Sequence, residues 1–153
     1  MVPVASGVML GADEGGRRID LAHRCSPGSY EFIELKLGIA CDTPLHAAME
    51  ILEYGLIYVF SRVHLDSLGY DRMNELLRAN AIALKVLAPA ESYLPGSLEA
   101  LEQAINFGLA ELWKMEKLDY AINFAFEQFP LGFRWSGPPE VATAALQARR
   151  RTY

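Results

Sequence analysis

Three ionisable side chains near the start of the chain could together cleave a phosphodiester bond. Asp20 ends an apolar–acid pair, and Glu34 and Lys36 stand one residue apart at the end of an apolar run. Side chains two apart on a β-strand point to the same face, so Glu34 and Lys36 are expected to project together. Two carboxylates beside one ammonium could bind a divalent metal and a phosphate at once. Phosphodiester cleavage is therefore the first hypothesis that this motif raises.

A β-hairpin is needed to bring Asp20 to the other two residues. The segment from Arg17 to His23 alternates apolar and polar residues, which predicts a strand. The turn from Ser26 to Ser29 has Pro and Gly in the middle. Tyr30 to Ile39 predicts a second, longer strand. Antiparallel pairing through this turn would place Asp20 beside the acid and the lysine of the second strand.

The rest of the chain predicts helices packed on a sheet. Asp42 and Thr43 before Pro44 form a strong helix start, because a capping residue precedes a Pro at the first helical position. The other expected elements are a short strand at 8–10, the helix from Pro44 to about His64, a shorter helix over 70–79, strands over 81–87 and 118–126, a helix from 98 to about 115, and a terminal helix from 138. This order predicts one α/β (α+β) domain over residues 1–153, with a central mixed β-sheet flanked by helices.

The helix from Pro44 is expected to pack one apolar stripe on the sheet. Residues recurring at helical spacing form this stripe: Leu45, Ala48, Leu52, Leu56, Val59 and Val63. A different face carries His46, Glu50, Tyr54, Tyr58 and Arg62. On composition alone, the two tyrosines are predicted to be packing residues and the histidine a surface or hydrogen-bonding residue.

The strand–turn–strand–helix context of Asp20, Glu34 and Lys36 resembles the PD-(D/E)xK nuclease superfamily, which has a restriction-endonuclease-like fold. That family's core has three antiparallel strands, a helix and a further strand. Its acid lies on the second strand and its acid-x-Lys motif on the third. The resemblance covers about residues 8–90, with about 91–153 as an elaboration. Only about 16 residues precede the motif, so the resemblance implies a core that lacks or shortens the first helix.

The resemblance implies a role for each motif residue. Asp20, Glu34 and Lys36 would be catalytic. Asp20, Glu34 and the Leu35 carbonyl would hold Mg²⁺ or Mn²⁺. Glu50 and Tyr54 match a supporting Gln-x-x-x-Tyr pair of some members, with Glu in place of Gln. Three basic residues beside the motif could contact nucleic acid: Arg17, Arg18 and Arg24.

The amino-acid composition and the net charge limit the classes of protein to which this chain can belong. The 153 residues are 52% apolar and 22% charged, which is typical of a folded protein. No apolar segment reaches the roughly 18 residues that span a bilayer. Cys25 and Cys41 form neither a metal spacing nor a disulfide framework, so a cytoplasmic location is expected. The net charge of −5 argues against a general nucleic-acid binder but does not exclude a nuclease with a local basic strip.

Two functions from different classes follow. The first is a metal-dependent nuclease-like phosphodiester hydrolase that acts on nucleic acid as a homodimer, with DNA favoured over RNA. The second is a non-catalytic interaction or oligomerisation module that keeps the same fold. In the second case Glu34 and Lys36 are a solvated strand face. Arg149 to Arg151 suit the negative end of the terminal helix, and a phosphate-binding tail is the alternative.

Overall fold

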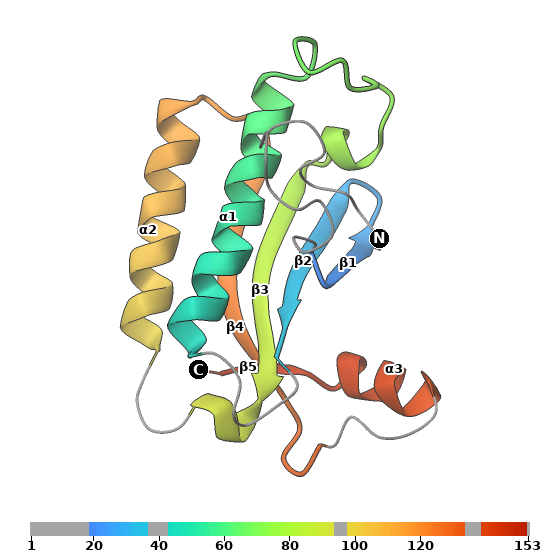
Figure 1. Ribbon diagram of the computed structural model, residues 1–153, viewed down its shortest axis with the longest axis vertical. Coiled ribbons are helices and arrows are strands. Elements are labelled where there is room, and N and C mark those ends of the chain that lie inside the picture. The colour runs from blue at the N-terminus through green and yellow to red at the C-terminus, as the bar shows by residue number, and fades with distance from the viewer. Residues whose placement is uncertain (1–18, 37–42, 94–97, 134–138, 153) are drawn as a thin grey trace, which may run out of the picture.

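Within the part of the chain that the structure describes, a mixed five-stranded β-sheet forms the centre (Figure 1). The computed structural model describes residues 19–36, 43–93, 98–133 and 139–152. The strands are β1 (Leu21–Ser26), β2 (Ser29–Leu35), β3 (Ala81–Pro89), β4 (Ala121–Phe129) and β5 (Arg150–Arg151), and they lie in that order across the sheet. β2, β3 and β4 are parallel, whereas β1 and β5 are antiparallel to their neighbours.

Two long helices cover one face of this sheet. α1 (Pro44–Val63) connects β2 to β3, and α2 (Glu99–Met115) connects β3 to β4. Both connections step across the sheet in the same direction. Since parallel crossovers are right-handed, both helices are expected on the same face, and Figure 1 shows them there side by side. The shorter elements are η1 (Leu76–Arg78), η2 (Ala90–Tyr93) and α3 (Pro139–Gln147). Within the described residues no helix could cross a membrane.

Strand alternation divides the buried apolar residues between the two faces. The main core lies between the sheet and the two long helices, and includes Phe32, Leu84, Phe124 and Phe126, each at most 1% exposed. A second core lies on the opposite face, where α3 covers the sheet: Ile33, Leu87, Phe129 and Ala145. Burying one such large side chain contributes about 1.5–3 kcal/mol.

The hairpin and the first long helix are confirmed, while other boundaries differ. The predicted shorter helix over 70–79 is reduced to the single turn η1. The last predicted strand begins at Ala121 instead of 118 and extends to Phe129. The terminal helix ends at Gln147, and Arg150–Arg151 form the edge strand β5. The strand predicted at 8–10 lies outside the described residues.

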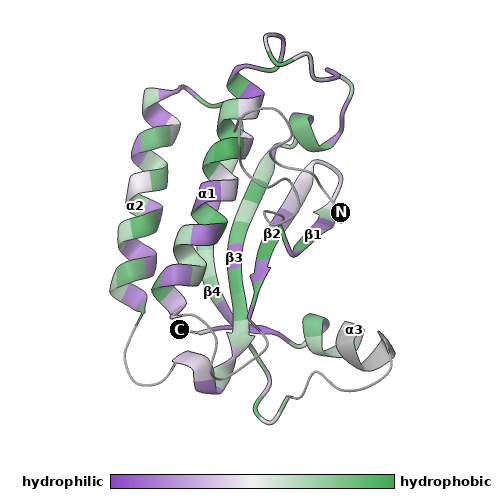
Figure 2. Cartoon of the chain, in the orientation of Figure 1, coloured by the Kyte–Doolittle hydropathy of each residue, from purple (hydrophilic) through white to green (hydrophobic). Residues whose placement is uncertain are grey.

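The apolar stripe predicted for α1 is wrong in half of its members. Leu45, Leu56 and Val63 are 54%, 51% and 48% exposed. The residues that α1 buries are Ala47, Ala48, Ile51, Tyr54, Gly55, Tyr58, Val59 and Ser61. A Cβ at Gly55 would lie 2.5 Å from Leu84 Cδ1, so this glycine lets α1 approach β3 closely. Four of these eight buried residues are Ala, Gly or Ser, and hydrophobic residues recur along the whole helix (Figure 2).

Candidate active site

The hairpin brings Asp20 to the end of β2. The ladder pairs Leu21 with Ile33, and one further step in the same register places Asp20 opposite Glu34. The Leu35 backbone N–H donates a hydrogen bond of 2.8 Å to Oδ2 of Asp20. Residues opposite each other in a ladder share a face, so the two carboxylates lie on the side covered by α1. The convergence of these two acids agrees with the expectation from sequence.

Lys36 joins two carboxylates from different elements. Its Nζ lies 2.9 Å from Oε1 of Glu34 and 2.6 Å from Oε2 of Glu50. The Lys36 and Glu34 side chains are 14% and 8% exposed, whereas Glu50 is more open at 36%. The Lys36 backbone N–H also donates to the Leu87 carbonyl of β3, at 3.0 Å. We call Asp20, Glu34, Lys36 and Glu50 the carboxylate–lysine cluster.

The start of α1 positions Glu50 over the carboxyl end of β2. Thr43 caps the helix by accepting the His46 N–H at 3.2 Å, and Pro44 occupies the first helical position. His46 Nε2 in turn lies 3.6 Å from Oε1 of Glu50, one helical turn away. Ligand sites in sheets with parallel strands lie at the carboxyl ends of those strands. The carboxylate–lysine cluster occupies this place.

Burial shifts the protonation of the cluster. Removal from water raises the pKa of Glu34 to about 7, and the charges of Asp20 and Glu50 act in the same direction, while Lys36 opposes them. Burial would lower the pKa of Lys36, but hydrogen bonds to Glu50 and Glu34 outweigh it and raise this pKa. Lys36 therefore stays protonated at neutral pH. Glu34 is the group of the cluster whose pKa lies near neutral pH.

The donor atoms of the cluster suit a hard divalent cation. Within the described part of the chain, hydrogen bonds occupy Oδ2 of Asp20 and Oε1 of Glu34, which leaves the second oxygen of each carboxylate for another ligand. Mg²⁺ prefers carboxylate, carbonyl and water oxygens. A buried carboxylate with a raised pKa gains from a cation that replaces its proton. Asp20, Glu34 and the Leu35 carbonyl are thus the residues that could hold the metal.

The remaining residues predicted for the site have different surroundings. Tyr54 is 9% exposed and its ring belongs to the main core, one turn beyond Glu50. Arg24 shares a face with Asp20 but lies four residues along the hairpin, roughly 13 Å away, and pairs with Glu75 at 2.9 Å. Arg17 and Arg18 lie outside the described residues. The structure therefore brings together the two acids, the lysine and Glu50, and leaves Arg24 apart.

A second charged group lies on the opposite face of the sheet, where sequence reasoning did not place one. Glu31, Lys85 and Glu127 stand on adjacent strands, and Arg149 reaches them from the segment after α3. Burial would raise the pKa of Glu31, but hydrogen bonds from Lys85 and His23 and the charges of Lys85 and Arg149 lower it to about 2. Charged residues inside otherwise apolar strands were the signal in the sequence. We call these four residues the sheet-face cluster.

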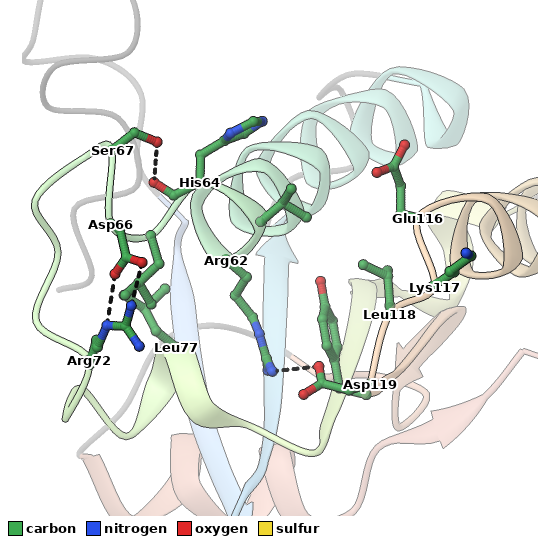
Figure 3. Close-up of a pocket in the computed structure, with 13 residues that line it drawn as sticks. Arg62, His64, Asp66, Ser67, Arg72, Leu77, Glu116, Lys117, Leu118 and Asp119 are labelled. Atoms are coloured by element: carbon green, nitrogen blue, oxygen red, sulfur yellow. Dashed lines mark hydrogen bonds and ion pairs between the residues drawn. The ribbon is translucent and has the colours of Figure 1, made fainter.

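A pocket of about 800 Å³ lies at the other end of α1 (Figure 3). Arg62 enters it from α1, donates to the Ala79 carbonyl and lies 3.0 Å from Asp119. Its guanidinium stacks over the Tyr120 ring, 3.9 Å from the centroid. Arg72 and Asp66 form a second ion pair at the rim. Because Arg62 already binds protein groups on several sides, its role here is to join α1 to the starts of β3 and β4.

Comparisons with known proteins give no family. No family model matches the chain, no curated protein is significantly similar to it, and no solved structure matches its fold.

Proposed function

We propose that this protein is a metal-dependent phosphodiester hydrolase with a PD-(D/E)xK nuclease-like core, acting on nucleic acid. The observation that carries the proposal is the convergence of Asp20, Glu34 and Lys36 at the carboxyl end of β2, with Glu50 added from α1. A hairpin, a helix and a parallel strand follow one another as that core requires. An acid pair beside one lysine could hold a metal ion and stabilise the charge that develops on a phosphate.

Each residue has a distinct task in this chemistry. Asp20, Glu34 and the Leu35 carbonyl would hold Mg²⁺ or Mn²⁺, which when bound polarises a phosphate and acidifies a water. Lys36 orients the attacking water and stabilises the negative charge that develops on the phosphate oxygens. Glu50 holds the Lys36 ammonium from the other side, at 2.6 Å. Glu50 stands where the resembled motif has Gln, and this contact orients the lysine.

Substrate and assembly complete the proposal. DNA is favoured over RNA, with Arg17, Arg18 and Arg24 as the basic residues nearest the motif in sequence. The surface of α1 supports a homodimer, because large apolar side chains that are 44–59% exposed follow one another along it: Leu45, Met49, Leu56, Phe60 and Val63. Apolar surface of this extent on one helix is typical of a protein contact.

Cleavage assays with a lysine variant test the proposal. Wild type should cleave DNA with Mg²⁺ or Mn²⁺ and lose this activity in a chelator. Lys36→Ala should lower the cleavage rate about 10²–10³-fold, because it removes a group that stabilises transition-state charge. Lys114→Ala is the matched control, since Lys114 also pairs with a glutamate at 2.7 Å but is 63% exposed. Its rate should stay at the wild-type level.

Two outcomes would contradict the assignment. Metal-dependent cleavage that is unchanged in Lys36→Ala would remove the lysine from the chemistry. A folded wild-type protein that cleaves neither DNA nor RNA, single- or double-stranded, would favour the non-catalytic interaction module. Single- and double-stranded substrates of both nucleic acids in the same assay also identify the preferred substrate.

Metal affinity should depend on pH through Glu34. Its pKa in the folded protein is about 7 instead of 4.5, so a proton occupies the carboxylate below neutrality and competes with the metal. The affinity for Mg²⁺ should therefore rise about tenfold for each pH unit up to about 7 and then level off. Isothermal titration with Mg²⁺ across this range measures the slope. An affinity that stays constant down to the ordinary glutamate pKa would contradict metal binding by a Glu34 carboxylate with a raised pKa.

A further inference from the structure

Three side chains of the hairpin bring a nitrogen, a sulfur and an oxygen close together on the face of the sheet away from α1 and α2. His23 and Cys25 are two apart on β1, and Glu31 pairs directly with His23 in the ladder. His23 Nδ1 lies 3.0 Å from Oε2 of Glu31 and 3.7 Å from Cys25 Sγ. All three donor atoms lie within 4.8 Å of one another.

An irregularity in the hairpin places the thiol there. The ladder pairs Arg24 with Tyr30 and then Ser26 with Ser29. Cys25 is therefore an extra residue on β1 that has no paired residue on β2. Such a β-bulge bends its strand and turns a side chain away from its regular direction. Bulges of this kind are frequent next to functional sites.

The His23–Glu31 and His23–Cys25 separations, 3.0 and 3.7 Å, are close to those between ligands of a tetrahedral zinc ion, and the third lies within 4.8 Å. With bonds of about 2.0–2.1 Å to nitrogen or oxygen and about 2.3 Å to sulfur, neighbouring ligands stand roughly 3.4–3.6 Å apart. We propose that His23, Cys25 and Glu31 form a binding site for Zn²⁺. Three protein ligands leave the fourth position for water. His23 and Cys25 are exposed, so the ion can enter directly from solvent.

The sheet-face cluster supports this site. Lys85 holds Oε1 of Glu31 and leaves Oε2 directed at His23. A fixed second oxygen is the usual way in which proteins orient a metal-binding carboxylate. Arg149 also contacts Oε2, but it keeps a second carboxylate partner, since its Nε lies 2.7 Å from Oε2 of Glu127. When the ion binds Oε2 of Glu31, Arg149 can move away from this oxygen, because the Glu127 carboxylate still balances the charge of its guanidinium.

The donor set separates this site from the carboxylate–lysine cluster. Imidazole and thiolate favour zinc and cobalt, whereas a set made of carboxylate and carbonyl oxygens favours Mg²⁺. The two sites also lie on opposite faces of the same hairpin. The zinc proposal does not rest on the proposed nuclease activity, and either can fail alone.

Cobalt is the probe for this site, because a cobalt–thiolate bond gives a charge-transfer absorption that oxygen ligands do not produce. Titration of the whole protein with Co²⁺ should develop this band at one equivalent, and Zn²⁺ should abolish it. Cys25→Ser should lose the band, while Cys41→Ser, which removes the other thiol, should keep it. In a Glu34→Gln background, which removes the other proposed divalent-cation site, Zn²⁺ should raise the melting temperature of the protein and of its His46→Gln variant but not of its His23→Gln variant.

The same measurements can overturn the proposal. Absence of the band in wild type, or a band that disappears in Cys41→Ser and persists in Cys25→Ser, would exclude the site. A Zn²⁺-dependent rise in melting temperature that survives in His23→Gln would place the ion elsewhere. Glu34→Gln should leave the cobalt band unchanged, so a loss there would show that the two faces do not act separately.

Discussion

Replacing Glu34 by Gln is expected to abolish Mg²⁺ binding and nucleic-acid cleavage together while the protein stays folded. The amide cannot replace a charged metal ligand, and a bound metal contributes several kcal/mol of transition-state stabilisation. At about 1.4 kcal/mol for each factor of ten, the cleavage rate should fall about 10³-fold or more. The carbonyl of the new amide can still accept the hydrogen bond that Lys36 gives to Glu34 at 2.9 Å.

The stability difference between this variant and wild type should depend on pH in a defined direction. The pKa of Glu34 is raised from 4.5 to about 7, so the folded protein binds more protons than the unfolded chain between these values. Wild-type stability from this group therefore falls as pH rises through that window. The Glu34→Gln variant lacks this dependence, and thermal unfolding should increasingly favour the variant from acid to neutral pH.

Glu111→Gln is the control for both measurements, because Glu111 pairs with Lys114 on the surface and is 47% exposed. It should keep metal binding, cleavage and the wild-type pH profile of stability. Tight Mg²⁺ binding by Glu34→Gln would show that the metal has other ligands. An unchanged stability difference from acid to neutral pH would mean that Glu34 ionises in the folded protein as it does in water.

Arg62→Ala is expected to destabilise the protein by about 2–4 kcal/mol. The change leaves the carbonyl of fully buried Ala79 without its charged donor and removes the guanidinium from the Tyr120 ring. A hydrogen bond to a charged group contributes about 1.5–3 kcal/mol, and a desolvated cation–π contact up to about 2 kcal/mol. The ion pair with Asp119 adds little, because that carboxylate is 84% exposed. Urea unfolding measures the loss.

Arg72→Ala is the matched control for Arg62→Ala. Arg72 also pairs with an aspartate at the rim of the same pocket, but both side chains of that pair are exposed. An exposed pair contributes at most about 1 kcal/mol, so this variant should stay near wild type. Equal losses in the two variants would mean that Arg62 contributes no more than a surface charge.

Local patterns were sufficient to predict the hairpin, the start of α1 and the convergence of the cluster. Alternation, a Pro-Gly turn and a capped Pro all act over a few residues, and the face shared by Glu34 and Lys36 follows from strand geometry alone. Asp20 needed only the register of one hairpin. Glu50 was expected beside the motif through the family resemblance, and its contact with Lys36 agrees with that position.

Features that depend on the whole sheet could not be predicted in this way. Hydrophobicity alone selected Leu45, Leu56 and Val63 as the packed side of α1, whereas close approach to β3 requires small residues such as Gly55. The sheet-face cluster joins residues of three strands, whose order no local pattern reveals. The interpretation of Arg149 to Arg151 as a helix end failed, because α3 stops at Gln147, Arg149 pairs with Glu31 of β2 and Arg151 pairs with Glu102 of α2.

The position of Arg149 has a consequence for the order of folding. Its partner Glu31 lies 118 residues earlier in the chain, and the other buried partner of Glu31, Lys85, lies 54 residues after that glutamate. Contacts of such large sequence separation form late, because the intervening chain must first lose conformational entropy. The charge of Glu31 on the hairpin is therefore fully compensated only when the segment after α3 is in place. A newly synthesised chain would carry Glu31 without its arginine partner until that segment has emerged from the ribosome.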